Sequence, residues 1–113
     1  MLEERTKRFH IEILKLTEKF PRNAGGFETA KQIIRSAGSI AANYRATKRA
    51  KSKADFIYKI EIVLEEADET LYWLEIIQDS QLLIYPDLFR LIKEADELTA
   101  IFAATVKTAK SHK

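Results

Sequence analysis

Five cationic side chains fall within nine residues near the middle of the chain. Clusters of Lys and Arg attract phosphate groups, so the chemistry they suggest is contact with a polyanion. Residues 29–54 carry seven basic residues and no acid, whereas residues 60–89 carry eight acids and no base. The formal net charge of +2 therefore conceals two blocks of opposite sign. The cluster consists of Arg45, Lys48, Arg49, Lys51 and Lys53.

This basic cluster has two interpretations that the sequence leaves open. It is a candidate phosphate-binding patch that contacts the backbone of RNA or DNA, with Tyr44 and Tyr58 flanking it as rings on which a base stacks. It is equally the solvated end of a helix, because cations near a helix C-terminus interact favourably with the helix dipole. In an oligomer, the same cations would pair with acids of neighbouring subunits.

Catalytic and metal-binding chemistry is not indicated. The chain has no Cys. Di-iron helical bundles use Glu-x-x-His motifs on facing helices, and this sequence has none. Ser36 and Ser39 have no His or Lys at a spacing typical of a nucleophile and its base. The acidic residues without a nearby His are Glu61, Glu65, Glu66, Asp68 and Glu69. We therefore expect no enzyme, no catalytic residue, no metal and no cofactor.

Apolar residues recur at alternating spacings of three and four, which indicates amphipathic helices at about 3–20, 27–50, 53–78 and 86–109. At 113 residues the chain is expected to form one domain, 1–113, and three Gly with two Pro are too few for an all-β fold. Short loops favour an all-α, antiparallel up-down-up-down four-helix bundle. The predicted core stripe of the second helix is Phe27, Ala30, Ile34, Ala37, Ala41 and Tyr44. That of the third is Phe56, Ile60, Val63, Ala67, Thr70, Leu74 and Ile77.

Helix-breaking and helix-capping residues separate these helices. Pro21 and the stretch 23–26 are expected to break the chain after the first helix, and Ser52 to cap the third together with Asp55. Pro86 suits the first turn of the fourth helix. Gly38 lies inside the second helix, which predicts a close approach by a neighbouring helix. Residues 111–113 are expected to fray.

No apolar stretch resembles a signal peptide or the roughly 20 residues of a membrane span. The lack of Cys fits a reducing compartment, so a cytoplasmic protein without a membrane partner is expected.

An antiparallel pairing of the second and third helices predicts a structural ion pair. With a tight turn near Lys51, Arg35 comes level with Glu66, and Glu65 and Glu69 lie about one turn around it. A bidentate salt bridge is expected there.

The third helix carries more apolar surface than one bundle needs. Ile57, Leu64 and Leu71 form a second stripe, and Trp73 adds surface elsewhere. This surplus predicts a homo-oligomer interface at these four residues. The alternative is that so small a bundle buries the helix more deeply.

Three motifs together resemble the 23S ribosomal RNA intervening-sequence family. They are RSAGSIAANYRA at 35–46, RAKSKADF at 49–56 and EEADETLYWLE at 65–75, with Phe20-Pro21 also similar. The resemblance implies a bacterial four-helix bundle that assembles into a ring-like homopentamer. Genes of this kind lie in insertions within large-subunit ribosomal RNA genes and elsewhere in bacterial genomes. Many members have Glu-Gly where this chain has Tyr44-Arg45-Ala46.

The accessory proteins of diversity-generating retroelements are similar, and they bind nucleic acid and a reverse transcriptase. The resemblance brings no catalytic residues. The leading hypothesis is a non-enzymatic homo-oligomer that binds RNA or DNA through the basic cluster. The alternative is a protein-only assembly or adaptor module, including an accessory subunit of a reverse transcriptase or a ribosome-related partner.

Overall fold

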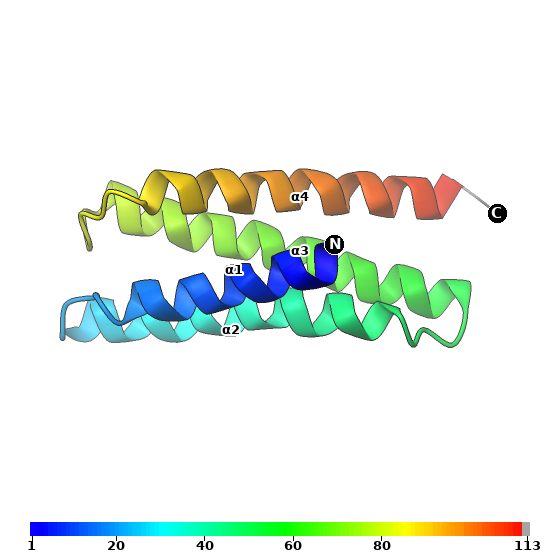
Figure 1. Ribbon diagram of the computed structural model, residues 1–113, viewed down its shortest axis with the longest axis horizontal. Coiled ribbons are helices and arrows are strands. Elements are labelled where there is room, and N and C mark those ends of the chain that lie inside the picture. The colour runs from blue at the N-terminus through cyan, green and yellow to red at the C-terminus, as the bar shows by residue number, and fades with distance from the viewer. Residues whose placement is uncertain (112–113) are drawn as a thin grey trace.

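The computed structural model describes residues 1–111, which form four helices and no strand. They are α1 (Leu2–Thr17), α2 (Ala24–Thr47), α3 (Lys53–Asp79) and α4 (Leu88–Ser111). Consecutive helices run in opposite directions along a rod of 48 × 22 × 20 Å (Figure 1). The all-α prediction is confirmed. In the described part of the chain, no helix is both long enough and apolar enough to cross a membrane.

The helix boundaries follow from side-chain caps. The Asn23 side chain accepts a hydrogen bond from the Gly26 N–H at 2.8 Å, so α2 begins at Ala24 and not near 27. The stretch 23–26, expected as a break, is therefore the first turn of α2. The fourth helix begins at Leu88, which places Pro86 in the turn before it. Ser111 is the last residue of α4, and the predicted fraying of 112–113 lies outside the described residues.

The start of α3 carries the predicted cap in a slightly different form. Ser52 Oγ accepts a hydrogen bond from the Asp55 N–H at 3.0 Å. The Asp55 carboxylate accepts in return from the Lys51 N–H at 3.0 Å, one residue earlier than in a standard capping box. These bonds fix the loop between α2 and α3.

The core stripe predicted for α3 is buried along most of its length. Ile60, Leu74 and Ile77 are fully buried, whereas Phe56 at the start of the helix is only half-buried. The other helices contribute their own apolar stripes to this core. They are represented by Phe9, Ile13 and Leu16 of α1, Ile33 and Ile40 of α2, and Leu91, Leu98 and Phe102 of α4.

The predicted buried face of α2 is only partly right, because Ala37 is buried and Ala30 and Tyr44 pack against the core, but other predicted positions are not buried. Ile33 and Ile40 are buried, while Phe27, placed in the predicted stripe, is 59 % exposed. Ala37 belongs both to the predicted series with Ile34 and to the buried series with Ile33 and Ile40. Both series have helical spacing, so spacing alone does not show which of them is buried. The buried series also contains Ser36, which faces a polar partner on α3.

Polar contacts fix how α2 packs on α3. The buried Thr70 hydroxyl donates to Ser36 Oγ at 2.7 Å. Beside it, Arg35 donates to both Glu66 oxygens at 2.9 and 3.1 Å and to Glu69 at 2.7 Å. Burial raises the pKa of Glu69, but hydrogen bonds from Arg35 and Trp73 outweigh it, so the net pKa lies below its usual value.

Helix α1 is held between α2 and α4. Arg5 forms a bidentate pair with Glu94, both N···O distances being 2.8 Å, and Arg90 donates to Glu12 at 2.5 Å. The close approach predicted at Gly38 is present, because a Cβ built there would lie 3.1 Å from His10 Nε2.

We predict that Gly26→Ala destabilises the protein. A Cβ at Gly26 would lie 2.0 Å from the Pro21 carbonyl oxygen, so the backbone has to move. Overpacking of this kind costs about 1–3 kcal/mol, which exceeds the gain of up to ~1 kcal/mol from replacing a helical Gly by Ala. Thermal unfolding followed by circular dichroism should show a lower Tm.

The matched control is Gly25→Ala, where an added Cβ meets its nearest neighbours, Asn23 Oδ1 and Leu82 Cδ1, at an ordinary 3.7 Å. This variant should have an unchanged or higher Tm. Equal Tm changes in both variants would contradict the packing explanation.

Candidate nucleic-acid interface

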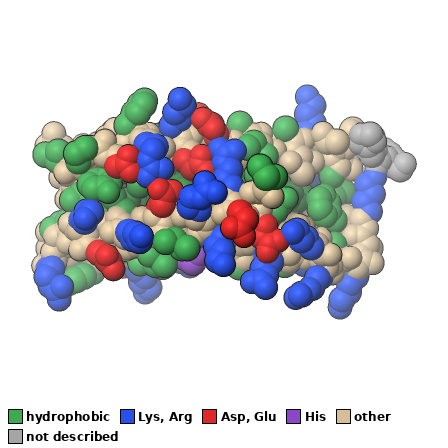
Figure 2. All heavy atoms as spheres, in the orientation of Figure 1, with side chains coloured by type: hydrophobic (Ala, Val, Ile, Leu, Met, Phe, Trp, Pro, Cys, Tyr) green, Lys and Arg blue, Asp and Glu red, His purple; other side chains and the backbone are tan. Residues whose placement is uncertain are grey.

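One end of the bundle collects cationic side chains from three helices. The last turn of α2, the loop 48–52, the first turn of α3 and the last turns of α4 all lie at this end (Figure 1). At the right-hand end of Figure 2, Lys and Arg side chains lie on the visible face without acidic ones among them. Alternating helix directions bring the end of α4 to the α2–α3 loop, although the two are far apart in sequence.

Three of the five predicted contact residues are free to meet a ligand. Arg49, Lys51 and Lys53 are all exposed. Within residues 1–111, none of them forms an ion pair, unlike nearby Lys59, which pairs with Asp55 at 2.6 Å. Their positive charge is therefore not neutralised locally and is available to phosphate groups.

The other two predicted contact residues share an acid. Lys48 donates to Glu3 of α1, and Arg45 Nε lies 3.9 Å from the second oxygen of the same carboxylate. The hydrogen bond from Lys48 lowers the pKa of Glu3 and raises the pKa of Lys48. Both cations remain more than half exposed, so Glu3 reduces their positive potential without hiding them.

Sequence reasoning missed the contribution of α4. Lys107 and Lys110 are exposed on its last turns, at the same end as the α2–α3 loop. Lys110 pairs with Glu61 at 2.6 Å, whereas Lys107 forms no ion pair within residues 1–111. The sequence shows two cations at the end of the predicted fourth helix, Lys107 within it and Lys110 just after it, but only the fold shows that they lie at the same end as the cluster.

The two tyrosines that flank the cluster differ in how far their rings are exposed to a ligand. The Tyr44 ring packs on Phe102 with 5.5 Å between ring centroids, so part of its surface is occupied within the bundle. Tyr58 is 64 % exposed on α3. Its ring is accessible to a ligand, although it lies beside Glu61 and Lys110 and not in the α2–α3 loop.

The four residues predicted as an oligomer interface do not form one surface. Leu64 and Leu71 are half-buried on the side of α3 that faces α4, and both partly pack against the core. Ile57 is half-buried as well. Trp73 lies on the α2 side, where its Nε1–H donates to Glu69 Oε2 at 3.1 Å. Part of the apparent surplus is therefore used within a single bundle.

An exposed aromatic residue extends the Leu71 surface. Phe89 of α4 is 69 % exposed and lines a shallow depression with Leu71 and Ile92. We call this surface, together with Leu64, the α3–α4 seam. Sequence reasoning did not find Phe89, because it lies outside the core stripe of α4 and becomes significant only beside Leu71.

Several acidic residues of α3 serve as ion-pair partners. Glu66 and Glu69 bind Arg35, and Glu61 binds Lys110. In residues 1–111, no group of three His, Cys, Asp or Glu side chains is arranged to hold a metal ion. The described geometry thus offers charge attraction and apolar contact.

The protein is thus a small four-helix bundle with a cationic end. The family model described as 23S rRNA-intervening sequence protein matches residues 2–104, and the chain belongs to this family. The comparison with curated proteins gives no match. A crystal structure of a protein of unknown function from the S23 ribosomal protein family of Bacteroides thetaiotaomicron is similar, with a TM-score of 0.85 and 31 % identity. That match covers 95 % of this chain and 99 % of the other.

Proposed function

We propose that this protein is a non-enzymatic homo-oligomer that binds the phosphate backbone of RNA or DNA at its cationic end. The proposal rests on Arg49, Lys51 and Lys53, which form no ion pair in the described part of the chain, with Lys107 from α4 at the same end. Such contacts are largely independent of base sequence. A cytoplasmic location, where RNA and DNA are accessible, accompanies this proposal.

Oligomerisation would strengthen such binding. The exposed Phe89 beside Leu71, and the exposed Tyr58 near Leu64, leave apolar surface along the α3–α4 seam. Apolar surface of this kind supports a contact with another subunit. A ring of five copies would present five sets of cations, and linked binding sites raise the overall affinity without any new contact.

A second candidate function is a protein-only adaptor, including an accessory subunit of a reverse transcriptase. The observation that favours it is the apolar surface exposed at the opposite end of the rod, where Ile84 is 84 % exposed and lies beside Leu83 and Phe89. In this function the cationic end meets acidic protein surfaces, and no salt-dependent nucleic-acid binding is expected.

We predict that replacing Arg49, Lys51 and Lys53 by Ala weakens binding of a fluorescent oligonucleotide. Each phosphate contact releases counterions, so the slope of log K against log salt should fall in magnitude by about 2–3 for three lost contacts. Fluorescence anisotropy at several salt concentrations measures this slope.

The control replaces Lys15, Arg22 and Lys31 by Ala. These residues match the first set in type and charge, are exposed, and lie towards the other end of the bundle. The control should bind almost as the unmodified protein does. An equal loss in both triple variants, or no binding by the unmodified protein at low salt, would reject the proposed site, and the latter result leaves the adaptor function.

Glu3→Gln should tighten oligonucleotide binding. This change removes the carboxylate that pairs with Lys48 and lies near Arg45, and it leaves both cations available to phosphate. The salt slope should become steeper by about 1–2. The control is Glu4→Gln, which removes the same charge from a neighbouring exposed residue that forms no ion pair within residues 1–111. A comparable gain with both variants would show a general charge effect instead.

Phe89→Asp should reduce the mass measured by light scattering. The unmodified protein should give several times the monomer mass of 13.0 kDa, five times for a pentamer. Because Phe89 is largely exposed, the charge should disturb an intersubunit contact and leave the bundle folded. Phe27→Asp, at an exposed aromatic residue on α2, is the control. A monomeric unmodified protein would refute the oligomer, and equal effects of both changes would refute its assignment to the α3–α4 seam.

A further inference from the structure

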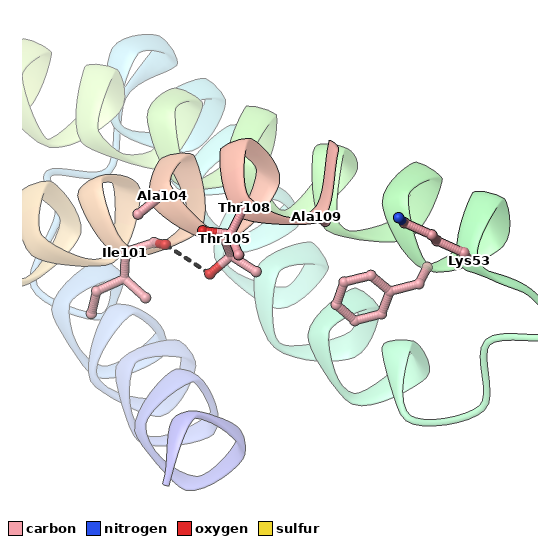
Figure 3. A pocket seen from close by; sticks show the side chains of 7 residues that line it. Lys53, Ile101, Ala104, Thr105, Thr108 and Ala109 are labelled. Atoms are coloured by element: carbon pink, nitrogen blue, oxygen red, sulfur yellow. Dashed lines mark hydrogen bonds between the residues drawn. The ribbon is translucent and has the colours of Figure 1, made fainter. Parts of the chain in front are cut away.

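An apolar groove opens beyond the beginning of α1, at Leu2. Its volume is about 790 Å³, and it runs between the last turns of α4 and the first turn of α3 (Figure 3). The sides are mostly apolar, with the Lys53 side chain at one edge. The lining residues are Lys53, Phe56, Ile101, Ala104, Thr105, Thr108 and Ala109.

The groove continues the path of α1 along α4. Helix α1 has 16 residues, against 24 in α4, and the two run antiparallel with Glu12 beside Arg90 and Arg5 beside Glu94 and Glu97. Leu2 packs against the core near the beginning of α1. In the described structure, α4 beyond Ile101 therefore has no α1 residue opposite it.

The groove floor is a continuation of the core. Phe56 belongs to the same stripe of α3 as the fully buried Ile60 and Val63, yet it is only half-buried, as is Ile101. The side chains of α4 along the groove are small, so a helix backbone can approach closely. Thr105 Oγ1 donates to the Ile101 carbonyl oxygen at 2.9 Å and so is satisfied within its own helix. The surface thus has the shape and polarity of a helix-binding site.

The positive charges around the groove favour a partner helix that carries acidic residues. Lys53 lines it, and Arg49, Lys51 and Lys107 lie at the same end of the bundle, all without ion pairs in residues 1–111. We propose that the groove binds an amphipathic helix of a partner protein, with an apolar face against Phe56 and Ile101 and acidic residues towards Lys53. This peptide site is distinct from phosphate binding, although both use Lys53.

The proposal can be tested with a displayed library of 16-residue helical peptides, selected on the full-length protein. Enriched peptides should share an apolar stripe at i, i+3, i+4 and i+7 and carry net negative charge. Fluorescence polarisation of synthetic peptides then compares two variants. Ala104→Glu places bulk and negative charge in the groove and should weaken binding at least about tenfold. Ala103→Glu makes the same change at an exposed position of α4 outside the groove lining, and should change the affinity less than about twofold.

Three results would overturn the proposal. The first is the absence of enriched helices, or the enrichment of basic ones. The second is equal binding of the selected peptides by both variants. The third is a loss of oligomer mass in Ala104→Glu alone, which would assign the groove to a second copy of this chain. Circular dichroism of both variants establishes that each remains helical.

Discussion

The contact between α2 and α3 sets the arrangement on which the remaining features depend. The Thr70–Ser36 hydrogen bond is buried at this contact, and Arg35 spans Glu66 and Glu69 beside it. Each hydroxyl also has a carbonyl acceptor in its own helix, so a shift of either helix would cost the interhelical hydrogen bond itself, about 0.5–1.5 kcal/mol, and would also separate Arg35 from its two carboxylates. This register fixes the short loop 48–52 at one end, and with it the cations that flank the loop.

Much of the fold could be predicted because α3 carries one continuous core stripe. The stripe repeats without a break from Ile60 to Ile77 and its residues are fully buried, whereas the shorter second stripe of Ile57, Leu64 and Leu71 is half-buried. In α2 two apolar series overlap, and the choice between them depends on Ser36 meeting Thr70, a contact across 34 residues of sequence. The start of α2 was misplaced for a local reason, since the capping role of Asn23 outweighs the turn preference of the glycines that follow.

The candidate site could be predicted only in part from the sequence. Whether a cation is paired with an acid depends on which helices pack together, and this is decided by the tertiary structure. Clustering along the chain identified Arg49, Lys51 and Lys53, but it did not show that Glu3 from α1 pairs with Lys48. It also did not show that Lys107 of α4 lies at the same end. The groove beside Phe56 was similarly hidden, since it results from the different lengths of α1 and α4.

Lysine footprinting tests the central claim most directly. The protein is acetylated with and without a saturating oligonucleotide at low salt, and mass spectrometry measures the reactivity of each lysine. The cationic end predicts strong protection of Lys51, Lys53 and Lys107, with Lys15 and Lys31 unchanged. Uniform protection of all five lysines, or protection confined to Lys15 and Lys31, would contradict the proposed interface.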